Sequence, residues 1–358
     1  KNPQHIIKIM KECADSQELV EKFYDQNLRK DFSNTPITEI IEILHDLDEL
    51  IFEYWLNAYL CDAFDPQGHE LLREEMEKAK VKLTEQERDN MMRSNKLNFM
   101  QEERLAMLKL AKRVKEEISL EEAKELLKEH AHKYFYVDNS WESTRTLTVE
   151  DFVEKLKEML NVKIDEQIED LTTNWDEVHL SLKNKHNISD ELMNLFLLYR
   201  NLFIMRDERK YHTLLSNHIY DLAFLRISQI LEMDFNDLRF ILTEEIQENV
   251  TKDELIKKIE KRKEIFTEVY QNKQSTLFEG QDSMEIAEAI QKTLSQDGSV
   301  IKGSCACRGK VKGTVRVITG ESHFSKFNEN EVLVAPMTRP EYLTLMKKAL
   351  AIVTDEGG

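Results

Sequence analysis

Apolar residues in the first 290 positions of the chain recur at steps of three and four. The clearest run is preceded by Ser33-Asn34-Thr35-Pro36 and consists of Ile37, Ile40, Ile41, Leu44, Leu47 and Ile51. Such steps place side chains on one face of a helix, and a Ser or Thr cap close to a Pro is a typical helix start. The pattern predicts an amphipathic helix that begins near Ile37.

Helix-start signals continue along this part of the chain. Residues 119–122 and 148–151 are capping boxes, in which Ser or Thr is followed three positions later by an acidic residue. Ser189 caps a helix that we expect to run to roughly Tyr211. Further helices are expected over residues 101–115, 243–249 and 253–270. Residues 1–290 therefore indicate an all-α region of roughly ten helices, with residues 134–137 as the one candidate strand.

The periodicity changes after Asp297. Residues 299–304 and 310–319 alternate between apolar and polar side chains and are rich in Val. Alternation of this kind predicts two strands, joined here at Arg308-Gly309.

A compact apolar run at residues 331–335 predicts another strand. Pro340 fits the first turn of a helix over residues 341–350. The apolar residues 351–354 then predict a buried strand. A strand–helix–strand order with a buried last strand implies that the two strands are parallel.

Glycine and charge divide the chain at about the same place. Of the nine glycines, only Gly68 precedes residue 280. The chain carries a formal net charge of −18; residues 291–358 hold ten basic and seven acidic side chains, which leaves −21 for residues 1–290. We therefore predict two domains of different class, an all-α domain over 1–290 and an α/β domain over 299–358, with a linker at 291–298.

The composition also limits the classes of partner. A strongly acidic chain is a poor general binder of nucleic acid or of anionic membranes, since both present phosphate. No apolar stretch approaches the ~20 residues of a membrane span, and residues 1–5 do not resemble a signal peptide. Four scattered cysteines make neither a disulfide framework nor a zinc site, so we expect a cytoplasmic protein without a metal site of its own.

Three C-terminal segments resemble one known domain in the right order. They cover residues 302–313, 332–340 and 346–358, the last of which ends in Thr354-Asp355-Glu356-Gly357-Gly358. These segments resemble the swivelling phosphohistidine (mobile) domain of the phosphoenolpyruvate (PEP)-utilising enzyme family. PEP synthase, pyruvate phosphate dikinase and rifampin phosphotransferase contain that domain. One position departs from the family pattern, because Arg308 stands where the family commonly has Pro.

The resemblance implies a carrier of phosphate. In the family, a histidine lies a few residues after the Gly-Gly step and shuttles a phosphoryl group between two sites. Residues 354–358 would then form the base of the catalytic loop, with the histidine just after Gly358 and no catalytic residue within this chain. Mg²⁺ with ATP or PEP would bind outside the recognisable motifs, on a nucleotide- or PEP-binding domain or subunit. A small-molecule acceptor would receive the phosphate. The helical part resembles, more loosely, PEP-synthase-like mobile subunits.

Charged residues in the C-terminal segment suggest phosphate contacts. Glu356 could orient the imidazole, and Arg339, at the same end of the predicted sheet, could bind phosphate. Equally simple roles remain open, since Asp355 and Glu356 could cap and solvate a loop and Arg339 could be a solvated surface residue.

Arg206, Arg209 and Lys210 form a second candidate anion site. They lie within one to two turns of a predicted helix and could bind a phosphorylated or acidic substrate. Because Asp207 and Glu208 are interleaved with them, a surface ion-pair face is the alternative.

Three functional hypotheses follow. The first is a phosphotransferase, or a subunit of one, that passes phosphate from ATP or PEP to an acceptor through a phosphohistidine. The second is a non-catalytic, acidic helical binding or scaffold protein whose swivel domain is a relic. The third, from domain order alone, is a rifamycin-type antibiotic phosphotransferase.

Overall fold

The computed structural model describes residues 3–139, 144–271, 274–294, 303, 307, 309–338 and 342–355. The chain divides into two compact units, residues 1–255 and 256–358. Each unit is described by itself.

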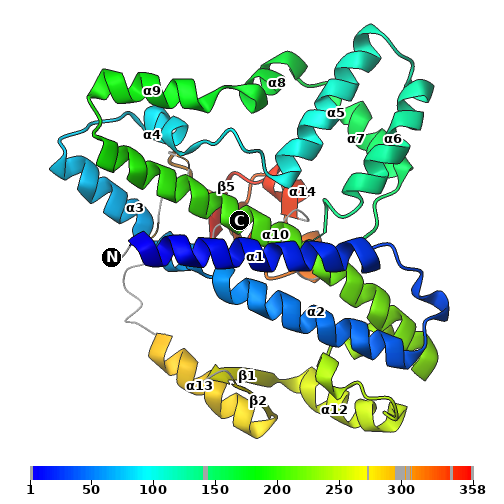
Figure 1. The fold of residues 1–358 in the computed structure, drawn as a ribbon. Coiled ribbons are helices and arrows are strands. Elements are labelled where there is room, and N and C mark those ends of the chain that lie inside the picture. Colours follow the sequence, from blue (N-terminus) through cyan, green and yellow to red (C-terminus); the bar gives the residue numbers. More distant parts are fainter. Residues whose placement is uncertain are drawn as a thin grey trace. The chain divides into compact units, whose positions relative to one another are not determined.

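The first unit is helical throughout its described residues (Figure 1). Two 3₁₀ turns, Phe32–Asn34 and Thr243–Glu245, accompany the α-helices, and α12 continues past residue 255. The α-helices are α1 (Pro3–Asn27), α2 (Ile37–Ala58), α3 (Leu60–Lys78), α4 (Glu85–Met92), α5 (Phe99–Glu116), α6 (Leu120–Tyr134), α7 (Val149–Met159), α8 (Ile164–Thr172), α9 (Trp175–His186), α10 (Asp190–Leu231), α11 (Phe235–Leu238) and α12 (Lys252–Glu264).

The predicted helix starts are confirmed. Helix α2 begins at Ile37, but its N-cap is Pro36 and no side chain caps it, so the Ser or Thr cap expected there does not form. Both capping boxes form: the Ser119 and Thr148 side chains each accept a hydrogen bond from a backbone N–H three residues on, at the starts of α6 and α7. These caps satisfy N–H groups that the first turn leaves free.

Helix α10 is the longest element and the centre of this unit. It contains 42 residues and contacts α1, α2, α3, α4 and α5. Apolar side chains around its circumference are buried, as expected of a helix that is covered on several sides. The prediction that it ends near Tyr211 is wrong, because residues 212–231 contain no Gly or Pro that would end the helix. It ends at Leu231, where Glu232 adopts a left-handed conformation.

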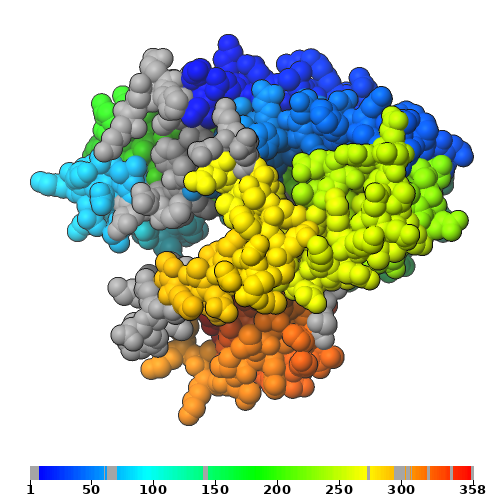
Figure 2. All heavy atoms as spheres, turned by 90° about the horizontal axis from the view of Figure 1, so that it is seen from below, coloured from blue at the N-terminus to red at the C-terminus, as the bar shows by residue number. Residues whose placement is uncertain are grey.

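The second unit begins within α12 and continues into a hairpin. Strands β1 (Phe266–Gln271) and β2 (Gln274–Glu279) pair antiparallel, and α13 (Gln281–Leu294) packs against both (Figure 1). These residues are the yellow and gold atoms of Figure 2. The prediction of a helix over residues 253–270 is therefore wrong after Glu264, and residues 1–290 are not all-α. The reason is local: Phe266, Val269 and Tyr270 favour a strand, and β2 supplies the partner.

Two smaller predictions in the helical region are also corrected. Residues 135–137 form a turn after α6, and the helix expected over residues 243–249 is a 3₁₀ turn at Thr243–Glu245.

A three-stranded parallel sheet follows in the order β3 (Val315–Val317), β4 (Val332–Ala335), β5 (Ala351–Thr354). A 3₁₀ helix, Glu321–Lys326, connects β3 to β4, and α14 (Leu343–Met346) lies between β4 and β5. The predicted parallel pair is confirmed. The predicted strand over 310–319 shortens to β3, the helix expected over 341–350 shortens to α14, and the segment 299–304 lies almost wholly outside the described residues.

One face of this sheet is covered. Leu333 and Ala335 of β4 are buried with Ile318, Tyr342 and Leu345. Strand β5 is more open than predicted: Ile352 is 41% and Val353 54% exposed. Among the described strands β5 has one neighbour, β4, so it lies at the edge of the sheet. No described helix is both long and apolar enough to cross a membrane.

Candidate functional site

The end of β5 is fixed to a buried strand. Thr354 pairs with Ala335 of β4, and the Asp355 N–H donates to the Ala335 carbonyl at 3.4 Å. Ala335 is buried, whereas Asp355 is exposed. Strand β5 therefore ends on a strand pair held by backbone hydrogen bonds, and its next residue, Asp355, faces solvent. Residues 356–358, which the sequence placed in that loop, lie outside the described residues.

The segment after β4 starts from the same edge of the sheet as the loop after β5, because parallel strands end on the same side. Residues 336–338 follow β4 there. Arg339, the predicted phosphate contact, lies outside the described residues. Its role, like those of Asp355 and Glu356, stays a prediction.

An ion pair that the sequence did not reveal joins β3 to the segment before β4. Arg316 donates to both carboxylate oxygens of Glu331, at 3.1 Å from Nε and 2.6 Å from Nη2, and the Asn328 N–H donates to the same carboxylate at 2.9 Å. The Arg316 guanidinium, and then the Asn328 N–H, lower the pKa of Glu331 to about 2. Glu331 is thus held ionised and fixes the start of β4.

Gly313, one of the family-like glycines, sits in close packing. A Cβ atom at this position would lie 3.0 Å from Leu350 Cδ2 and 3.4 Å from the Asn330 carbonyl oxygen. Because a side chain here would crowd the segment before β5, the glycine permits the close approach of the two segments.

The cationic stretch of α10 does not present three free cations. Arg209 makes a two-pronged ion pair with Asp62, with Nη1–Oδ2 2.5 Å and Nη2–Oδ1 2.9 Å, and its guanidinium lies 4.9 Å from the centre of the Trp55 ring. Arg206 lies 4.8 Å from the centre of the Phe203 ring, and Lys210 Nζ lies 3.9 Å from a methionine sulfur. Arg209 is therefore engaged with its own fold, and an anion site at these residues stays a prediction.

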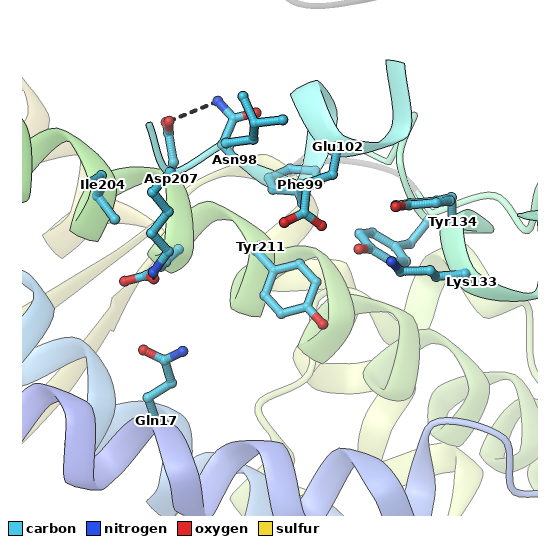
Figure 3. Close-up of a pocket in the computed structure, with 13 residues that line it drawn as sticks. Gln17, Asn98, Phe99, Glu102, Lys133, Tyr134, Ile204, Asp207 and Tyr211 are labelled. Carbon is cyan, nitrogen blue, oxygen red and sulfur yellow. Dashed lines mark hydrogen bonds and ion pairs between the residues drawn. The ribbon is translucent and has the colours of Figure 1, made fainter. Parts of the chain in front are cut away.

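A cavity of about 210 Å³ opens on the same part of α10 (Figure 3). Its aromatic wall comes from three places in the sequence: Phe99 at the start of α5, Tyr136 after α6, and Tyr211 of α10. The ring centres are 5.9 Å apart for Phe99–Tyr136, 5.7 Å for Phe99–Tyr211 and 5.5 Å for Tyr136–Tyr211. Gln17 of α1 lies on the opposite side of the cavity from α5 (Figure 3).

Several charged side chains line the cavity. Glu208 forms an ion pair with Lys96, and Asn98 Nδ2 donates to Asp207 Oδ2 at 2.9 Å. Glu102 directs its carboxylate toward the cavity (Figure 3). Burial raises the pKa of Tyr211, and the negative charges of Glu21, Glu102 and Asp25 raise it further. The Tyr211 hydroxyl thus lies in a negative potential.

Sequence reasoning had no signal for this cavity, since its walls come from helices that are far apart in the chain. Among the described residues, no three His, Cys, Asp or Glu side chains gather as a metal site.

Comparison with known proteins agrees with the sheet geometry. Residues 327–358 match the family described as "PEP-utilising enzyme, mobile domain". Over 239 residues, or 63% of the chain, the sequence is 28% identical to an uncharacterised phosphotransferase of Bacillus subtilis, YvkC, and this covers 26% of that protein.

Two further relatives match the C-terminal part at higher identity over shorter stretches. A probable PEP synthase of Archaeoglobus fulgidus is 48% identical over 59 residues, which are 16% of this chain and 8% of that protein. The PEP synthase of Pyrococcus furiosus is 36% identical over 90 residues, 25% of this chain and 10% of that protein. The chain thus spans about a quarter of the first relative and a tenth or less of the other two. The C-terminal part of this chain is therefore similar to the mobile domain of PEP-utilising enzymes, with a family match over residues 327–358.

Proposed function

We propose that this chain is part of a phosphotransferase in which the C-terminal segment supports a phosphohistidine carrier. Phosphate would pass from ATP or PEP to a small-molecule acceptor through a histidine that follows Gly358 in the natural protein. One observation carries the proposal: the family match over residues 327–358 coincides with the parallel β4–β5 pair, which ends at the loop base Thr354-Asp355.

The observed geometry suits a carrier. A phosphoryl-accepting histidine must be exposed and must present a neutral ring nitrogen from a rigid base. Strand β4 is the buried part of that base, and β5 is hydrogen-bonded along its length. Gly357 and Gly358 would allow a tight turn after β5, because glycine adopts backbone angles that other residues resist. Glu356 would then be close enough in sequence to orient the imidazole.

The donor site belongs elsewhere in this proposal. Phosphoryl transfer from ATP or PEP depends on Mg²⁺ and on Arg or Lys side chains that neutralise the moving charge. We place Mg²⁺ and the donor on a nucleotide- or PEP-binding domain or subunit. A cytoplasmic location stays a prediction.

The test is phosphorylation of the natural full-length protein. The protein is incubated with Mg²⁺ and ATP or PEP labelled in the transferable phosphate, together with its nucleotide- or PEP-binding partner where that lies on another chain. We expect label that is lost in acid and kept in base, as a phosphohistidine requires. Substitution of the first histidine after Gly358 by Ala, and the 1–358 chain itself, are the matched controls and should take no label. If the protein takes up no label from ATP and none from PEP, a non-catalytic binding protein is favoured instead.

A further inference from the structure

The cavity beside α10 is lined by none of the residues of the proposed carrier segment. It lies wholly within the first unit, between α1, α5, the end of α6 and α10 (Figure 3). At about 210 Å³ it has room for a small molecule and not for a peptide or nucleic-acid strand. Its walls combine aromatic rings with a few polar groups, which is the usual make-up of a small-molecule site.

The aromatic wall presents ring surface to a ligand. Tyr136 is 5% exposed and therefore fixed in place, while Phe99 and Tyr211 are partly open. The faces of aromatic rings carry partial negative charge, so they attract a cation as well as an apolar group.

The charges around the cavity also favour a positively charged ligand. The Lys96 ammonium is already paired with Glu208. The Lys133 ammonium lies 4.8 Å from the centre of the Tyr134 ring, on an exposed side chain at the rim. Glu102 forms no ion pair within 4.0 Å among the described residues, although its charge helps to raise the pKa of Lys133. Its carboxylate points into the cavity (Figure 3). The raised pKa of Tyr211 reflects, after burial, carboxylate charge rather than a nearby cation.

We propose that this cavity binds a small molecule that carries a protonated amine on an aromatic or apolar body. The ammonium would pair with Glu102 and face the ring of Tyr211, and the body would pack against Phe99 and Tyr136. An anionic ligand is disfavoured, because it would have to approach Glu102, Asp207 and Glu208 together.

This inference goes beyond the proposed phosphotransferase. If that function holds, the amine-bearing molecule is a candidate acceptor or regulator. Binding itself requires no phosphoryl transfer, so a failure of binding and a failure of labelling are separate results.

The test compares three probes that share a phenyl ring and differ in charge: phenethylamine, 3-phenylpropan-1-ol and 3-phenylpropionate. Ligand-observed NMR titrations with the 1–358 chain measure the three dissociation constants. We expect phenethylamine to bind at least tenfold more tightly than 3-phenylpropionate, with the alcohol between them. Equal binding of all three, tighter binding of the acid, or no binding of the amine at millimolar concentration would overturn the proposal.

A pair of variants on one helix locates the site. Glu102→Gln removes the carboxylate at the cavity, and Glu116→Gln removes a matched exposed carboxylate about 21 Å further along α5, at 1.5 Å per residue. We expect Glu102→Gln to weaken phenethylamine binding about tenfold and Glu116→Gln to leave it within about twofold. Both residues are exposed, so both variants should fold, and far-ultraviolet circular dichroism verifies this. Equal effects of the two substitutions would contradict the assignment.

A second pair tests the aromatic wall. Tyr211→Phe keeps the ring and Tyr211→Leu removes it. The proposal expects the Phe variant to bind phenethylamine within about threefold of the natural chain and the Leu variant to lose most of the binding. Retention of full binding by a folded Tyr211→Leu variant would contradict it.

Discussion

Replacement of His212 by Phe should remove a large part of the acid sensitivity of the helical unit. His212, on α10, is fully buried. Its ring stacks on Tyr24 at 5.7 Å and meets the edges of Tyr54 at 4.9 Å and Tyr211 at 5.0 Å. Within the described structure neither ring nitrogen has a hydrogen-bond partner. The Glu21 carboxylate is 3.9 Å from Nε2, but it is half exposed and too distant for a hydrogen bond.

Burial lowers the pKa of His212 to about 3. In the unfolded chain the pKa of a histidine is about 6.5, so the unfolded state binds a proton that the folded state refuses. Stability is therefore complete above about pH 6.5 and falls as the pH drops toward 3. Between pH 7 and pH 5 this one residue should lower the free energy of unfolding by about 2 kcal/mol.

Urea unfolding at pH 5, 6, 7 and 8 measures the effect. All three tryptophans lie in residues 1–255, so their fluorescence reports on the helical unit. At pH 7 the Phe variant should be about as stable as the natural chain, since loss of two unsatisfied nitrogens offsets any crowding. From pH 7 to pH 5 the free energy of unfolding of the Phe variant should fall by about 2 kcal/mol less than that of the natural chain.

A control in the same aromatic cluster separates titration from packing. Tyr54→Phe alters a neighbour of His212 without removing a group that titrates between pH 5 and 8, because burial raises the pKa of Tyr54. This variant should keep the full acid dependence. If His212→Phe also keeps it, His212 takes up its proton equally in both states and the reasoning is refuted.

Three further substitutions test individual contacts. Asp62→Asn removes the charged partner of Arg209, whose side chain is only 11% exposed, and should lower the free energy of unfolding by about 1–3 kcal/mol, seen as a lower urea midpoint. An unchanged midpoint would contradict this. Glu331→Gln should speed hydrogen exchange of β4 amides at pH 7 and flatten the acid dependence of the C-terminal unit. In the natural chain the lowered pKa of Glu331 stabilises the fold above pH 4.5, and this stabilisation is lost as the pH falls through about 2. Equal exchange in both proteins would exclude the role given to this pair. Gly313→Val should destabilise the same unit by about 1–3 kcal/mol, because its Cβ meets Leu350 at 3.0 Å; a melting temperature as high as that of the natural chain would show that the segments can separate.

Local signals predicted the parts of the fold that depend on neighbouring residues. Ser119 and Thr148 begin helices because a capping box acts within four residues. The β4–β5 pair was predicted because its strands are short apolar runs flanked by turn residues. The hairpin after α12 was missed because residues 253–264 are helical and the charged sequence continues without a break. The pairing with residues 274–279 decides the structure there.

The candidate sites differ in the same respect: one depends on residues that are neighbours in sequence, and the other on the packing of distant helices. The mobile-domain segment was predicted because its motifs are contiguous in sequence. The cavity could not be predicted, since Phe99, Tyr136 and Tyr211 meet only through the packing of α5, α6 and α10. Arg209 illustrates the same limit, because the sequence shows its charge but not its ion-pair partner Asp62, which lies 147 positions away.

The position of the phosphate on the natural full-length protein can be determined directly. After incubation with Mg²⁺ and ATP or PEP, with the donor-binding partner where it is separate, the protein is digested with trypsin at neutral to alkaline pH and analysed by mass spectrometry. Cleavage after Lys348 gives a peptide that begins at Ala349 and contains β5 with the residues that follow it. We expect one acid-labile phosphoryl group on a histidine in this peptide. Phosphate confined to other peptides, or none with either donor, would contradict it.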